Sequence, residues 1–483
     1  MTWADLVQRY LTVAVTHHPG YAFAWDEFTI PPTPVDPAAL SGAYQSMSDQ
    51  VDQVADAADD HEVRLLRWCL DDHRFELDTA LSWHKDPQFW VDRQCYGILA
   101  QAATGGLRDR PLPPEWIRAF LANLPDLFGA GMRNLNRREA GQVDLRRAVR
   151  HLAASHRLLQ QMGESAGGGC ADEMARAGAS IDRFSAWLSQ AIGNGHPLRP
   201  MGAQIWEVGL RARTGIACGP EELEHVLRCQ LDRSRREVAR TPAAVPGRIA
   251  RSVSEIDQLV ARLAGIFLPR FDGKECLVSL RLDVSDDTVP WVTSASYQSA
   301  ASRGGGPAVV FIRPGVYSNR ADLELDLVHE CFPGHHWQQT AQVRAHRSHR
   351  LCLRHSNPAF VEGWGRWCEG LYASLAADPS VNARFHARMA KYCGQALAAL
   401  LVHARGRPFT EVVESLTTMG VCGSADAASL VMHSYFEPWR ATAPIVGYLA
   451  LRKLAVELGE REMEAMVAQN GVVDLFGKGL SGE

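Results

Sequence analysis

Two histidines and a glutamate lie close together in the segment HECFPGHH, residues 329–336, and a second glutamate, Glu362, follows in FVEGW. Zinc hydrolases use three protein ligands, keep a fourth position for water, and need a carboxylate that accepts a proton from that water. Two histidines and one glutamate as ligands, with the other glutamate as the base, would meet these needs. The residue types therefore predict a zinc-dependent hydrolase.

The second histidine ligand is either His335 or His336. In the common HExxH pattern the second histidine stands four residues after the first, but here that position is Pro333. Because proline disrupts a helix interior and Gly334 permits a sharp turn, we expect one helix through Glu330, a break at 333–334 and a new helix from about His335. The break would return His335 to the metal. His336 would stand roughly 10.5 Å along an unbroken helix, so we favour His335 as ligand and expect His336 to support it or contact substrate.

The surroundings of the motif favour a metal over a solvated cluster. His329 and Glu330 follow an apolar helical run that contains Leu323, Leu325 and Leu327. Burying histidines and a glutamate there is unfavourable unless they are paired or bound to metal.

The two segments HECFPGHHWQ and FVEGWGRWCEGL resemble the paired signatures of the domain-of-unknown-function family 885, roughly HExxPGHHxQ and FVEGWAxYxE. The resemblance extends loosely over most of the chain. It implies a large, mainly α fold of the zincin-like type, similar to that of oligopeptidases and carboxypeptidases, with a deep cleft. It also implies that His329, His335 or His336, and Glu362 hold one Zn²⁺ per chain, with Glu330 as general base.

The segment HSYFEPWR, residues 433–440, resembles the C-terminal cleft wall of that family. Zincin chemistry needs a donor for the developing oxyanion, for which we expect Tyr435 first and His433 second. Arg440 has a planar fork that suits a substrate carboxylate.

Composition limits the classes of partner and the location. The chain has 483 residues, 46% of them hydrophobic, enough for two or three lobes. A net charge of −5 with interspersed signs gives no reason to expect nucleic acid or a membrane surface as partner. Eleven cysteines without a CxxC pair, and an N-terminus unlike a signal peptide, predict a cytoplasmic protein.

Hydrophobic spacing predicts helices over much of 61–103, then over 134–162, 171–193 and 249–267, with another starting near 219–220. Alternation predicts strands over 277–285 and 308–312, and from 321 the chain is expected to be helical again, with breaks near 357–358, 406–408 and 438. We expect a helical N-terminal lobe over 1–270 and a catalytic lobe over 271–483, with its sheet at about 276–314. That sheet either pairs with an extended substrate or is purely structural.

These observations predict a hydrolase that cleaves an amide or peptide bond in a small peptide or an amino-acid-derived substrate. Gln395, Ala399 and Pro444 stand where the resembled family usually has Arg, Asp and Tyr, which favours a narrow substrate range. Two alternatives remain open. One is a metal-dependent lyase, cyclase or similar enzyme acting on an amino-acid-derived metabolite, and the other is a non-catalytic metal-binding protein.

Overall fold

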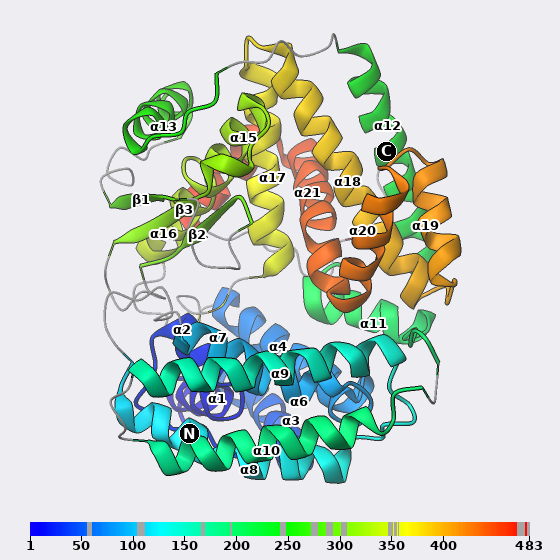
Figure 1. Ribbon diagram of the computed structural model, residues 1–483. Coiled ribbons are helices and arrows are strands. Elements are labelled where there is room, and N and C mark those ends of the chain that lie inside the picture. Colours follow the sequence, from blue (N-terminus) through cyan, green and yellow to red (C-terminus); the bar gives the residue numbers. More distant parts are fainter. Residues whose placement is uncertain are drawn as a thin grey trace. The chain divides into compact units, whose positions relative to one another are not determined.

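The structure is a computed structural model. It describes residues 1–55, 60–103, 112–165, 170–193, 196–241, 248–271, 279–285, 293–300, 307–345, 351, 355, 357–470 and 479–480. Within these residues the fold is mainly helical with one three-stranded sheet, as the sequence predicts (Figure 1). No described helix is both long and apolar enough to cross a membrane.

The chain forms two compact units, one over Met1–Arg199 and one over Pro200–Ala300 together with Pro307–Glu483. The sequence placed the boundary near residue 270, so three helices assigned to the N-terminal lobe belong to the second unit: α11 (Ala203–Thr214), α12 (Pro220–Arg240) and α13 (Val253–Phe267). The reason is packing, because α12 lies along α18 (Pro379–His403), far later in the chain.

The first unit is built from short and long helices. They are α1 (Trp3–His17), α2 (Gly20–Trp25), α3 (Pro37–Val54), α4 (Asp60–Arg74), α5 (Ser82–Lys85), α6 (Pro87–Val91), α7 (Gly97–Ala103), α8 (Pro114–Asn134), α9 (Gln142–Ser165) and α10 (Ala171–Ser189), with π-helical turns at Phe75–Thr79 and Asp92–Tyr96. Helix α10 packs against both α8 and α9, and Phe128 stacks on Phe184 with ring centroids 4.8 Å apart. The amphipathic patterns over 134–162 and 171–193 correspond to α9 and α10.

The second unit continues with further helices, of which those that start at residues 335, 358, 409 and 438 follow the predicted breaks. They are α15 (Arg320–Glu330), α16 (His335–Ala345), α17 (Pro358–Leu375), α18, α19 (Phe409–Thr418), α20 (Ser424–Phe436), α21 (Pro438–Leu458) and α22 (Glu460–Asn470). Proline occupies the first helical position of α17, α18 and α21, where its missing N–H leaves no hydrogen bond unmade.

The sheet has the order β1–β3–β2, with β1 (Leu280–Val284) parallel and β2 (Ala295–Gln298) antiparallel to the central β3 (Ala308–Ile312). The predictions of strands within 277–285 and at 308–312 are confirmed, although residues 277 and 278 lie outside the described part. Strand β2 was not predicted, since its four half-buried residues, ASYQ, show no run of apolar side chains.

Helices α17 and α21 cross with their backbones in contact. A Cβ atom at Gly447 would overlap the carbonyl oxygen of Ala359, and one at Gly363 would overlap the backbone of Gly447. Glycine at both positions therefore allows α17, which carries Glu362, to lie directly against α21.

Candidate metal centre

The predicted break in the motif is present. Helix α15 ends at Glu330 and α16 begins at His335. A Cβ atom at Gly334 would overlap the carbonyl oxygens of His329 and Val328, so only glycine fits this return of the chain. The Nε1 of Trp364, on α17, donates to the carbonyl oxygen of Pro333 at 2.8 Å and ties the break to the helix that carries Glu362.

The break brings His335 back to His329. One ligand atom each of His329, Glu330 and His335 lies within 4.8 Å of the others, and the two imidazole rings meet edge to face with centroids 4.4 Å apart. Both histidines are buried, and burial is the main cause that lowers their pKa values. The Nδ1 of His335 also makes no regular hydrogen bond to a described residue. Neutral imidazoles are the form that binds metals, so this donor set fits a divalent metal ion.

His336 lies toward the sheet. Its Nδ1 is 3.3 Å from the hydroxyl oxygen of Tyr297, and its Nε2 is 3.3 Å from Oγ of Ser279. The compact group found among the described residues contains His335 and not His336. This placement agrees with the preference for His335 as the ligand.

Glu330 is held by strand β2. The backbone N–H of Tyr297 donates to Oε2 of Glu330 at 2.8 Å. Desolvation raises the pKa of Glu330 to about 8, and the nearby charge of Glu362 acts in the same direction. Sequence reasoning missed Tyr297, because it contributes a backbone group from a strand that has no clear pattern.

Glu362 faces His329 from α17. Its Oε2 lies 3.7 Å from Nε2 of His329, and its side chain is 39% exposed. Desolvation opposes its ionisation, but His335, His329, Arg366 and Arg440 together lower the pKa of Glu362. Glu362 is thus a carboxylate next to the cluster, while the most compact group has Glu330 in its place.

A buried charge network lies on the other side of the His329 ring. The Nδ1 of His329 is 3.0 Å from Oε1 of Glu369, at an angle too sharp for a regular hydrogen bond. Arg366 donates to the same carboxylate, and Nη1 of Arg388 is 3.6 Å from its Oε2. A carboxylate facing Nδ1 favours the tautomer with the proton on Nδ1, which leaves Nε2 free as a ligand atom facing Glu362.

The C-terminal candidates are on α20 and α21. Tyr435 is buried, stacks on the His403 ring with centroids 5.2 Å apart, and its carbonyl oxygen is 2.9 Å from Nε2 of His403. His433 and Arg440 are exposed. Arg440 is one of the charges that lower the pKa of Glu362. The donor roles of Tyr435 and His433 stay predictions.

Residues 283–462 match a family model described as "Bacterial protein of unknown function (DUF885)". Both signature segments fall within this range, so the match supports the resemblance drawn from them. No curated protein matches the chain at a significant level.

Two solved structures share the fold. A Shewanella oneidensis protein described as a "putative lipoprotein of unknown function" matches with a TM-score of 0.75 and 14% identity, over 97% of this chain and 96% of that one. A protein from Colwellia psychrerythraea described as a "putative lipoprotein" matches with a TM-score of 0.69 and 13% identity, over 98% and 97%. These likenesses concern the fold alone, and the expected cytoplasmic location stays a prediction.

Proposed function

We propose that this protein is a zinc-dependent hydrolase that cleaves an amide or peptide bond in a small peptide or an amino-acid-derived substrate. The observation that carries the proposal is the buried pair His329 and His335, with lowered pKa values and with Glu330 within 4.8 Å. Desolvated imidazoles grouped with a carboxylate are unfavourable in a core without a cation between them.

His329, His335 and Glu362 would hold the ion in this proposal. When bound, zinc would polarise a substrate carbonyl and acidify water. Glu330 accepts a proton from the attacking water and passes it to the leaving nitrogen, and the N–H of Tyr297 keeps its carboxylate in one orientation. Glu369 faces Nδ1 of His329 and favours the tautomer that leaves Nε2 for the ion, and Arg440 pairs with a substrate carboxylate.

The first test is the metal content of the purified protein. We expect about one zinc ion per chain in the wild type, loss of zinc in His329→Ala and His335→Ala, and retention in the matched variant His336→Ala. Circular dichroism would check that each variant is folded. A wild-type chain that takes up no zinc, or equal zinc in all the variants, would overturn the metal site and the function with it.

The second test is turnover. Dipeptides and N-acylated amino acids would be supplied to the zinc-loaded protein, and hydrolysis is expected to stop when a chelator removes the metal. Zinc binding without hydrolysis of any such substrate would favour the alternative of a metal-dependent lyase or cyclase.

A further inference from the structure

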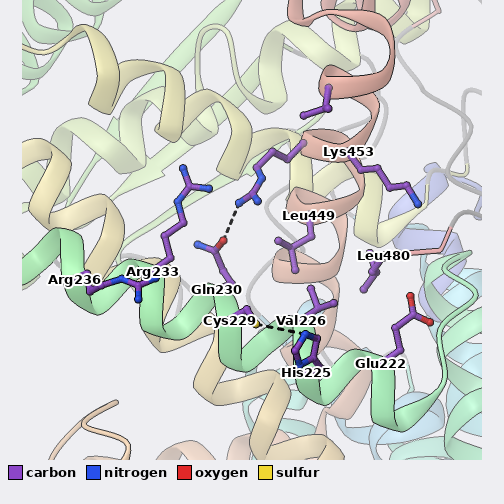
Figure 2. A pocket seen from close by; sticks show the side chains of 12 residues that line it. Glu222, His225, Val226, Cys229, Gln230, Arg233, Arg236, Leu449, Lys453 and Leu480 are labelled. Atoms are coloured by element: carbon purple, nitrogen blue, oxygen red, sulfur yellow. Dashed lines mark hydrogen bonds between the residues drawn. The ribbon is translucent and has the colours of Figure 1, made fainter. Parts of the chain in front are cut away.

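A cavity lies between α12 and α21, with a volume of about 420 Å³ (Figure 2). Its walls come from α12, α21 and Leu480. The volume lies in the range of pockets that bind small molecules, roughly 300 to 1,000 Å³.

Positive charge dominates this pocket. Arg233, Arg236, Arg452 and Lys453 line it, against one carboxylate, Glu222. In the described part of the chain, salt bridges form around Arg228, Arg240 and other α12 residues, but none involves Arg233 or Arg236. Unpaired guanidinium groups at one cavity leave strong donors available to an anion.

Two of these arginines converge from different helices. Arg452 of α21 donates to Oε1 of Gln230 on α12 at 2.9 Å, so its side chain reaches from α21 to α12. Burial raises the pKa of Tyr448, whereas Arg452 and Arg233 both act to lower it, so both guanidinium groups lie near that phenol. Figure 2 shows Arg233 and Gln230 extending from α12 into the space beside α21.

The lining also contains a group of apolar side chains, beside the polar side chains of His225, Cys229 and Gln230. Val226, Leu449, Val456 and Leu480 line the same cavity. A pocket with a few convergent polar groups and an apolar wall suits an organic molecule with one charged end.

We propose that this pocket binds a small organic phosphate, with the phosphate group held by Arg233, Arg236 and Arg452 and the organic part against Leu449 and Val226. Several planar guanidinium forks match the multiple acceptor oxygens of a phosphate dianion. The site is separate from the metal centre, since the described residues that line it do not include His329, Glu330, His335 or Glu362. The proposal does not depend on the proposed hydrolase.

Calorimetric titration of the full chain with phenyl phosphate, inorganic phosphate and phenol tests the site. Phenyl phosphate is expected to bind more tightly than inorganic phosphate, and phenol is expected not to bind. Arg233→Gln and Arg452→Gln should each lower the affinity for phenyl phosphate by about tenfold, since each removes a charge-assisted contact. The matched variant Arg235→Gln removes the same charge from the same helix outside the pocket and should change the affinity by less than about twofold.

Two further results decide the case. Binding should persist in His329→Ala, whereas loss there would put the phosphate at the metal centre and overturn the proposal. The proposal would also be overturned if Arg235→Gln lowered the affinity as much as Arg233→Gln does. Absence of binding at millimolar phenyl phosphate would overturn it as well. If Arg452→Gln is less stable because it loses the hydrogen bond to Gln230, Arg233→Gln still gives the answer, because the side chain of Arg233 is exposed.

Discussion

At the scale of single residues, the proposed metal centre has two candidate carboxylates for a third ligand beside His329 and His335. Glu330 belongs to the most compact group, while Glu362 is 3.7 Å from Nε2 of His329. The resemblance to the family motifs implies that Glu362 binds the metal and that Glu330 accepts the proton. Charge-neutral variants of the two residues separate these roles.

Glu330→Gln is expected to retain zinc and to lose hydrolysis by at least roughly 100-fold, because the amide cannot accept the proton. Glu362→Gln is expected to lose zinc. Metal content and turnover would be measured on the same samples. If Glu330→Gln instead releases zinc while Glu362→Gln keeps it, the ligand is Glu330.

Glu369 is buried at 0% exposure, near Nδ1 of His329 and two arginines. Glu369→Gln should weaken zinc binding by about 10- to 100-fold through the orientation of His329. It should also lower the melting temperature, because Arg366 and Arg388 lose a buried counter-charge. Zinc affinity would be measured by competition with a chelator well below the melting temperature. A lower melting temperature with unchanged affinity would mean that Glu369 only balances charge.

At the scale of elements, the sequence predicted those features whose cause is local. The break at Pro333–Gly334 and the starts of α17 and α21 follow from proline and glycine chemistry, and the sequence locates them closely. Strand β2 and the boundary between the two compact units after residue 199 depend on contacts between segments that are distant in the sequence. Local sequence patterns do not predict such contacts. The same holds for Tyr297, whose N–H reaches Glu330 only after the sheet has formed.

The contact between α17 and α21 predicts a strong effect of one methyl group. Gly447→Ala should reduce the free energy of unfolding by about 1–3 kcal/mol, because the added carbon meets the backbone at Ala359. The matched change Gly265→Ala in α13, where nothing lies within 4 Å, should leave stability unchanged or raise it by up to about 1 kcal/mol. Urea unfolding measures both. Equal stability of the two variants would contradict this close approach.

Asp322 joins α15 to α18 through Arg384 and Arg388. Burial opposes its ionisation, but these arginines outweigh burial and lower the pKa of Asp322. The stabilisation by ionised Asp322 is therefore fully present above the pKa of this residue in the unfolded chain, about 3.9. It is lost as the pH falls through the lower pKa of Asp322 in the folded chain. Melting temperatures between pH 3 and pH 7 should show Asp322→Asn less stable at pH 7, with the difference shrinking in acid. Asp257→Asn, on the exposed face of α13, is the control and should show no such pattern.

At the scale of the whole molecule, the two compact units should respond differently to metal. Zinc at 100 times its dissociation constant should stabilise the second unit by about 2.7 kcal/mol. Calorimetry should show an unfolding transition whose temperature rises when zinc is added to the wild type or to His336→Ala, but not when it is added to His329→Ala. If the first unit, Met1–Arg199, melts separately, its transition should not move. A shift confined to that first transition would place the metal elsewhere.

Helix α21 runs from Arg440, one of the charges that lower the pKa of Glu362, to Arg452 and Lys453 at the basic pocket. One helix thus carries residues of both candidate sites of the second unit. Thermodynamic linkage then requires reciprocity: whatever factor a bound phosphate imposes on zinc affinity, zinc must impose on phosphate affinity.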